Sequence, residues 1–189
     1  MDPEFVLYSD FNCPFCYAFG ERVIQLQAAD RIAWRGVQHA PHLAVPMASA
    51  GPTFRRELER EVQSIQRLAP DVPISLPRGK PNTGPAIQAV ASALRIDGEK
   101  AHALATSFYR ALWQHRRDIS DSATIHTLMA EAGLHDAIDA AAADSITRSW
   151  HNAWLERGVG SVPELVRRDG EALIGLVDRD ILHGFLAFR

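Results

Sequence analysis

The sequence predicts an α/β fold in which a central mixed sheet is flanked by helices and carries an inserted all-helical subdomain. Strand, helix and strand patterns follow one another within the first 38 residues. A long helical stretch comes next, and strand patterns return only near the C-terminus, around a hairpin turn. The first three elements favour a parallel pair, and the hairpin adds antiparallel strands. We therefore divide the chain into a sheet domain, residues 1–52 and 157–189, and an inserted helical subdomain, residues 53–156.

The composition is that of a globular protein with a sizeable core. The chain has 189 residues, of which 47% are hydrophobic and 23% charged. A net charge of -3 does not predict the basic surface that binding to nucleic acid or an anionic membrane requires. No apolar run approaches the roughly 18 residues that span a bilayer. We predict a cytoplasmic protein that binds neither nucleic acid nor a membrane. Met1 to Phe5 resembles a remnant of cloning sites, so the alternative that a native leader was trimmed stays open.

The first 38 residues are predicted to form a strand, a helix and a second strand. Phe5 to Tyr8 is an apolar, β-prone run, and apolar residues at helical spacing then continue to about Ala29. Arg31 to Gln38 alternates, with Ile32 and Trp34 on one face. The intervening length suits the crossover of a parallel βαβ unit.

Both cysteines lie where the first strand meets the first helix, in Cys13-Pro14-Phe15-Cys16. Pro14 suits the first helical position, which makes Cys13 the capping residue. Unpaired backbone N–H groups and the positive end of the helix dipole then face its sulfur and lower its pKa. We predict a dithiol/disulfide switch in which Cys13 is the nucleophile and Cys16 resolves the mixed disulfide. In a βαβ context this spacing is a thioredoxin-like signal.

Two other interpretations of the cysteines stay open. Cys13 and Cys16 are also spaced like half of a zinc site, for which His39 and His42 offer two further ligands. Pro14 fits a redox helix start better, and the histidines lack the usual finger spacing, so we predict no metal. The second interpretation is a pair of buried, inert thiols.

The middle of the chain is predicted to be helical, apart from one irregular segment. Thr53 to Ala69 is an amphipathic packing helix, and prolines at 70, 73, 77, 81 and 85 then mark a hinge or lid segment. The later helices are separated by breaks at Asp97-Gly98, Ile119-Ser120-Asp121 and Gly133. The predicted helices are Ala86 to Ile96, Glu99 to Arg117, Ser122 to Ala132 and Asp136 to Arg157.

The C-terminal part returns to the sheet. A strand pattern resumes in the run from Gly158 to Val166 and is followed by a turn signal at Arg168-Asp169-Gly170. Ala172 to Val177 is then the second strand of an antiparallel pair. Asp180 to Phe188 closes the chain as a helix.

Three polar residues near these motifs have two interpretations each. Asp10 either relays a proton to Cys16 or caps a local turn, and we favour the turn. Tyr17 either donates its hydroxyl to a substrate or packs under the helix, and we favour packing. Asn82 either contacts a glutathione-like ligand or caps its loop.

These motifs resemble a known family. An Asp-x-x-Cys-Pro-x-Cys-Tyr run after a first strand, a helical insertion and a late Gly-x-x-x-Val-Pro before a hairpin are similar to the DsbA-like branch of the thioredoxin superfamily. The resemblance is greatest to its cytosolic oxidoreductases, which are related to 2-hydroxychromene-2-carboxylate isomerases and kappa-class glutathione transferases. It covers essentially the whole chain and implies a thioredoxin fold.

The resemblance also implies roles for individual residues. Cys13 and Cys16 correspond to the attacking and resolving cysteines, and Val162-Pro163 to a loop with a cis proline that faces the dithiol. Such a loop exposes backbone with which an extended substrate pairs. We therefore assign catalysis to Cys13 and Cys16, and substrate binding to Pro14, Phe15, Val162 and Pro163. Phe15 replaces the histidine of strongly oxidising periplasmic members, so we predict a less oxidising dithiol.

The function that we predict is thiol–disulfide exchange with protein or small-molecule thiols and disulfides. No tightly bound cofactor is expected, and glutathione is a candidate co-substrate. The alternative function is a glutathione-dependent isomerase or transferase, in which Cys13 takes the place of a serine that activates the glutathione sulfur. A metal-binding or chaperone-like interaction module is a third class.

Overall fold

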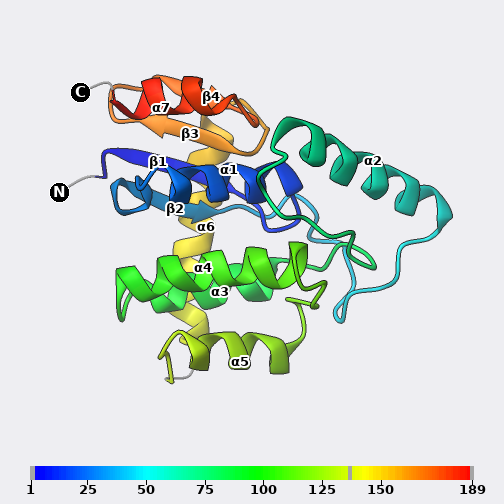
Figure 1. The fold of residues 1–189 in the computed structure, drawn as a ribbon. Helices are drawn as coiled ribbons and strands as arrows, with labels where there is room; N and C mark the ends of the chain where they lie inside the picture. The colour runs from blue at the N-terminus through cyan, green and yellow to red at the C-terminus, as the bar shows by residue number, and fades with distance from the viewer. Residues whose placement is uncertain (1–2, 136–137, 188–189) are drawn as a thin grey trace.

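The computed structural model describes residues 3–135 and 138–187, and in them it shows the mixed sheet flanked by helices that the sequence predicts (Figure 1). The strand order is β2-β1-β3-β4. β1 runs parallel to β2 and antiparallel to β3, which pairs in turn with β4 in antiparallel fashion. The strands are β1 (Phe5–Ser9), β2 (Ile32–Gly36), β3 (Glu164–Arg167) and β4 (Ala172–Ile174).

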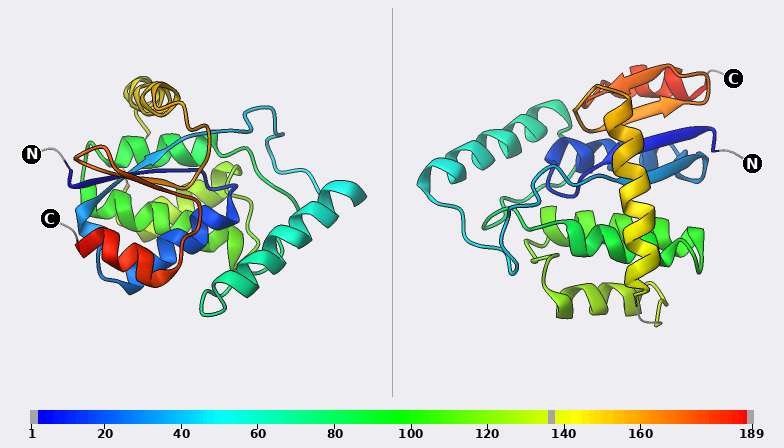
Figure 2. Two further views of the ribbon diagram at one scale, coloured as in Figure 1. Left: turned by 90° about the horizontal axis from the view of Figure 1, so that it is seen from above. Right: turned by 180° about the vertical axis from the view of Figure 1, so that it is seen from behind.

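Helices cover both faces of the sheet, and a further group of helices packs beside it (Figure 1). α1 and α7 lie on one face and α6 crosses the other (Figure 2). α3 packs against α4, α5 and α6, and α2 packs against α1. The helices are α1 (Pro14–Gln25), α2 (Pro52–Leu68), α3 (Gly84–Ala93), α4 (Gly98–Trp113), α5 (Ser122–Glu131), α6 (Ala140–Glu156) and α7 (Arg179–Ala187), with a 3₁₀ turn at Ala29–Arg31.

The loop between β1 and α1 is anchored in the core by Phe11. This ring is fully buried, stacks on Trp34 at 5.0 Å between centroids and meets the edge of Tyr109 at 4.7 Å. The indole Nε1 of Trp113 donates a 2.8 Å hydrogen bond to the Phe11 carbonyl. Aromatic packing and a buried hydrogen bond from α4 therefore hold the two residues before Cys13 in place.

Several predicted helices are shorter in the structure. Two of them end close to a residue whose backbone adopts the left-handed conformation. The first helix ends at Gln25 instead of Ala29, and Gln27 then has φ 54°. α4 ends at Trp113 instead of Arg117, and Arg116 has φ 58°. Such a conformation cannot continue a right-handed helix. α3 begins at Gly84, two residues earlier than predicted, and ends at Ala93 instead of Ile96.

The C-terminal strands are also shorter than predicted. β3 begins only at Glu164, because Gly158 and Gly160 have φ of 70° and 67° and keep the preceding segment out of the sheet. β4 ends at Ile174, before Gly175 at φ 78°. α6 begins at Ala140; the predicted start at Asp136 and the predicted end of the last helix at Phe188 lie outside the described residues.

The predicted helix breaks carry side-chain caps. Asp97 accepts hydrogen bonds from the backbone N–H groups of Glu99 and Lys100 at the start of α4. Asp121 accepts one from Thr124 at the start of α5. No helix in the described ranges has both the length and the apolar character needed to cross a bilayer.

Arg22 joins α1 to two other parts of the fold and gives the first prediction. It is 5% exposed, and its guanidinium donates to the carbonyl oxygens of Leu68 and Val177. Arg22→Met leaves both carbonyls without this charged donor, so the free energy of unfolding should fall by about 2–3 kcal/mol in urea titrations. The control Arg55→Met removes an exposed partner of Glu59 and should change it by less than about 0.5 kcal/mol. If both substitutions lowered the free energy of unfolding by the same small amount, this role of Arg22 would be contradicted.

Candidate active site

The sulfur of Cys13 lies at the N-terminus of α1. Cys13 is the capping residue in extended conformation, Pro14 occupies the first turn, and Sγ accepts a hydrogen bond from the backbone N of Cys16 at 3.4 Å. The backbone N of Cys13 donates to the Asp10 carbonyl at 3.0 Å, which closes the turn that leads into the helix. The predicted capping arrangement is therefore present, and helix N–H groups face the sulfur.

The two thiols have opposite electrostatic environments. Cys13 is partly exposed, whereas Cys16 is 1% exposed, and both are free thiols. The pKa of Cys13 is lowered, chiefly by a hydrogen bond from the Cys16 side chain and further by backbone N–H groups and the charge of Lys80. Burial raises the pKa of Cys16 well above the ordinary thiol value. Of the two thiols, Cys13 is therefore the one that ionises more readily to the reactive thiolate.

The loop before β3 meets Cys13 from the far end of the chain. The Cys13 thiol donates to the carbonyl oxygen of Val162 at 3.7 Å, and the Val162–Pro163 peptide bond is cis. Trp154 on α6 donates its Nε1 to the Ser161 carbonyl at 3.3 Å, which holds the start of the loop. Residues 149 positions apart thus form one site at the edge of the sheet where β1 ends.

Pro14 and Phe15 are also placed by the helix start. Pro14 is buried, and the half-buried ring of Phe15 packs against the core cluster. Their predicted contact with substrate stays a prediction. Tyr17 is buried and donates its hydroxyl to the Pro73 carbonyl, in keeping with the packing role that we favour.

Asp10 caps the local turn and binds a histidine from the neighbouring strand end. Its Oδ1 accepts from the backbone N of Asn12 at 3.1 Å, and its Oδ2 accepts from the backbone N of His39 at 3.0 Å. The Nδ1 of His39 lies 2.6 Å from the same Oδ2. The Asp10 hydrogen bond raises the pKa of His39. His39 is therefore engaged by a carboxylate, and no group of three or more His, Cys, Asp or Glu in the described part of the chain could hold a metal ion.

The irregular segment after α2 borders the cysteine loop. The side chain of Asn12 donates to the Pro81 carbonyl at 2.7 Å, and the preceding residue, Lys80, pairs with Glu61 on α2 at 2.8 Å. Asn82 caps its own loop, because its side chain accepts from the backbone N of Gly84 and donates to the Leu43 carbonyl. The segment is irregular as predicted, and its motion as a lid stays a prediction.

The sequence interpretation missed Lys80 and the Asp10–His39 pair. Because β1 and β2 are parallel, the residues that follow them meet at one edge of the sheet, and this signal was available for Asp10 and His39. Lys80 had no such signal, since its position depends on the path of an irregular segment.

The family model of the DSBA-like thioredoxin domain matches residues 4–187. No curated protein sequence matches the chain.

Solved structures share the fold at low sequence identity. A probable DsbA oxidoreductase from Streptomyces coelicolor is 19% identical with a TM-score of 0.77, over 96% of this chain and 87% of the other. The cytosolic disulfide reductase DsbM from Pseudomonas aeruginosa, solved with GSH, is 19% identical with a TM-score of 0.71, over 96% of both chains. A 2-hydroxychromene-2-carboxylate isomerase is 20% identical with a TM-score of 0.63, over 96% of this chain and 91% of the other.

The charge of Lys80 gives a prediction about the reactivity of Cys13. Lys80→Gln removes a positive charge that favours the thiolate, so the pKa of Cys13 should rise. The pH dependence of iodoacetamide alkylation at Cys13, followed by mass spectrometry, should move to higher pH. Lys100→Gln is the control, because Lys100 binds the Gly133 carbonyl and should leave the profile in place. Superimposable Lys80→Gln and wild-type profiles would argue against the charge effect.

The Asp10–His39 pair gives a prediction about stability and pH. Because the pKa of His39 is raised in the folded state, the pair stabilises the fold fully below the unfolded pKa of about 6.5. That contribution is lost as the pH rises through the folded pKa. Urea titrations should therefore show His39→Gln less stable than wild type at pH 5.5, with a smaller difference at pH 9. A difference that grows with pH would contradict this assignment.

Proposed function

The chain belongs to the family of DSBA-like thioredoxin domains, and on that premise we propose that it is a thiol–disulfide oxidoreductase that works through Cys13 and Cys16. The observation that carries the proposal is the asymmetry of the two thiols within one helical turn. Cys13 is partly exposed at a helix N-terminus with a lowered pKa, while Cys16 is buried with a raised pKa. A reactive thiolate backed by a protected thiol is the arrangement that two-step exchange requires.

The reaction follows from this asymmetry. The Cys13 thiolate attacks one sulfur of a substrate disulfide, forms a mixed disulfide and releases one substrate thiolate. Cys16 then loses its proton and attacks Sγ of Cys13, which forms the intramolecular disulfide and releases the second substrate thiolate. The substrate gains two electrons, and the dithiol loses them. In the opposite direction the Cys13–Cys16 disulfide oxidises a substrate dithiol.

The loop at Val162 and Pro163 is proposed as the place where the substrate backbone lies. The Val162 carbonyl is 3.7 Å from the Cys13 sulfur, so a polypeptide that pairs with this loop has its own sulfur beside Cys13. Pro14 and Phe15 form the helix start on the same site, and we assign them to substrate contact.

Glutathione is the small-molecule co-substrate that we propose, in a cytoplasmic setting. DsbM, a structural neighbour of similar size, is described as a cytosolic disulfide reductase and was solved with GSH. The alternative function, a glutathione-dependent isomerase or transferase, is supported by the likeness to the 2-hydroxychromene-2-carboxylate isomerase. A second thiol one turn from the first has no role in that chemistry, so we favour the oxidoreductase.

Single-cysteine variants test the proposal. Glutathione-dependent reduction of a mixed-disulfide substrate should be lost in Cys13→Ser, because the nucleophile is gone. In Cys16→Ser, multiple turnover of an intramolecular protein disulfide should collapse, and a mixed disulfide on Cys13 should accumulate and be visible by mass spectrometry. Full activity on protein disulfides in Cys16→Ser would remove the resolving role.

The same variant separates the two functions. A glutathione-dependent isomerase needs no resolving thiol, so isomerisation of 2-hydroxychromene-2-carboxylate should survive Cys16→Ser. The oxidoreductase proposal predicts no isomerisation in either the wild type or the variant. Isomerisation that survives in the variant, together with absent disulfide exchange in the wild type, would favour the isomerase.

A further inference from the structure

An ion pair closes the base of the loop that reaches Cys13. Arg157 is the C-terminal capping residue of α6, and Glu164 is the first residue of β3. The Nε of Arg157 donates to Oε1 of Glu164 at 2.5 Å. The Glu164 side chain is fully buried, and its Oε2 has no hydrogen-bond partner in the part of the chain that the structure describes. Within that part, Arg157 alone therefore binds the buried carboxylate.

The loop between these two residues is held at its ends and is loosely packed in between. Its two glycines have φ of 70° and 67° and are exposed, and nothing lies within 4 Å of the position that a Cβ would occupy at either. Towards the end of the loop, the carbonyl of Ser161 accepts from Trp154 at 3.3 Å, and the carbonyl of Pro163 accepts from the backbone N of Gly175 at 2.8 Å. The path of the loop therefore depends on how its ends are fixed.

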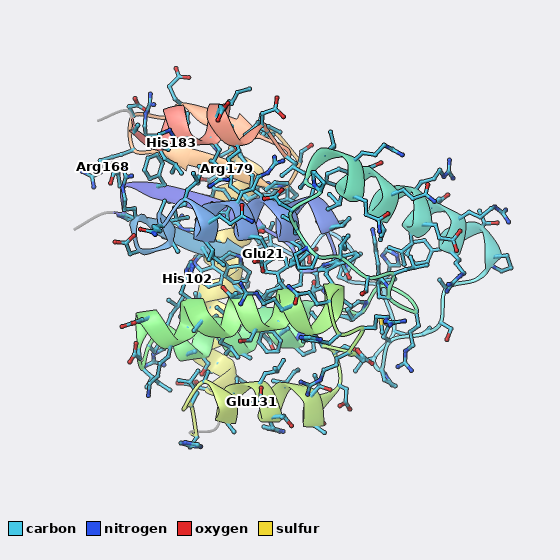
Figure 3. All side chains as sticks on the ribbon, in the orientation of Figure 1. Glu21, His102, Glu131, Arg168, Arg179 and His183 are labelled. Carbon is cyan, nitrogen blue, oxygen red and sulfur yellow. The ribbon has the colours of Figure 1, made fainter. Side chains whose placement is uncertain are left out.

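Glu164 lies at the end of β3 that is nearer to the cysteines. It pairs with Tyr8 near the end of β1, whereas Arg168, which follows β3, lies at the opposite end of the sheet, away from α2 (Figure 3). Glu164 directly follows the cis proline, and the residue before that proline is Val162, whose carbonyl accepts from the Cys13 thiol at 3.7 Å. The ion pair therefore fixes the chain two residues from the carbonyl that lies beside the reactive sulfur.

We propose that the Arg157–Glu164 ion pair positions the Val162 backbone for polypeptide substrates. It holds the loop where a substrate segment pairs with Val162 and brings its own cysteine sulfur onto Cys13. Arg157 and Glu164 act through Val162 and are positioning residues. A small disulfide has no backbone to pair with the loop, so its reaction with Cys13 does not depend on the ion pair. The ion pair thus favours polypeptide disulfides over small ones. The inference rests on the proposed function.

The physics of a buried ion pair separates positioning from stability. The desolvation of the two charges offsets much of their attraction, so the pair adds little net stability to the fold. The contact does supply direction, because an N–H donor and a carboxylate oxygen constrain both distance and angle. Well-packed apolar side chains of similar volume would stabilise the fold as well or better, but they would not fix the distance between the two loop ends. Mutation can therefore remove the positioning and keep the stability.

Stopped-flow reaction of the reduced protein with three disulfides of thionitrobenzoate tests the proposal. The first is 5,5′-dithiobis-(2-nitrobenzoate), which has no peptide backbone. The second is a peptide whose single cysteine carries thionitrobenzoate, and the third is the same peptide with methylated backbone nitrogens on both sides of that cysteine. In each reaction the Cys13 thiolate attacks one sulfur, forms a mixed disulfide and releases coloured thionitrobenzoate. The rate of this first step is the quantity compared.

The two single variants should lose rate only with the unmethylated peptide. Arg157→Gln and Glu164→Gln should each slow that reaction roughly tenfold or more, because the loop no longer holds the peptide sulfur in line with Cys13. The methylated peptide lacks the N–H donors that pair with the loop, so it should react slowly with wild type and no more slowly with either variant. The reaction with 5,5′-dithiobis-(2-nitrobenzoate) should stay within about twofold, which reports that each variant is folded around Cys13.

A double variant and a matched control complete the test. Arg157→Met combined with Glu164→Leu should unfold in urea at a concentration no lower than wild type and should still react slowly with the unmethylated peptide. The control is Arg148→Met on the same helix, which removes the exposed partner of Asp144. It should leave all three reactions within about twofold of wild type.

Three outcomes overturn the proposal. The first is a wild-type rate with the unmethylated peptide in both single variants. The second is a double variant that recovers this rate, because packing alone would then place the loop. The third is slowing by the same factor with all three disulfides, which indicates a general disturbance of Cys13. A wild type that keeps the peptide on Cys13 and never forms the disulfide to Cys16 overturns the proposed function instead.

Discussion

The chemistry of the site depends on one interaction, the hydrogen bond that the sulfur of Cys13 accepts from the backbone N of Cys16 at the first turn of α1. It places the sulfur where unpaired N–H groups and the helix dipole favour negative charge. Other parts of the fold hold the sulfur of Cys13 in this position. β1 is the inner strand between β2 and β3, and Phe11 and Trp113 fix the loop that follows it. The loop of Val162 and Pro163 then reaches the same sulfur from the other end of the chain.

The difference between the two thiols arises from burial within a single turn of helix. Cys13 lies at the cap, where it is partly exposed, and Cys16 is turned into the core beneath it. A low-dielectric environment disfavours the thiolate of Cys16, and helix N–H groups favour that of Cys13, so one geometric relation sets both reactivities. As a consequence, Cys16, the proposed resolving thiol, ionises with difficulty.

The fold class and the centre of the site could be predicted from sequence, because both rest on local patterns. The first two strands, their helix and the cap at Cys13 follow from hydrophobic period and from Pro14. Element ends were less predictable, since left-handed residues such as Gln27 and Arg116 stop helices without a Gly or Pro signal. The contacts of Lys80 with Glu61 and of Ser9 with Tyr109 join segments far apart in the chain. No local pattern encodes such pairs; they emerge only when the irregular segment and α4 pack onto the cysteine loop.

The central claim is that Cys13 and Cys16 exchange reversibly between dithiol and disulfide, and equilibration with glutathione tests it most directly. The protein is brought to equilibrium in buffers of graded ratios of reduced to oxidised glutathione, acid-quenched, alkylated and weighed by mass spectrometry. We expect a two-electron transition to an intramolecular Cys13–Cys16 disulfide. Its potential should be more negative than the roughly −120 mV of the oxidant DsbA, because Phe15 supplies no charge to the thiolate. Stable glutathionylation of Cys13 with no intramolecular disulfide at any ratio would contradict the account.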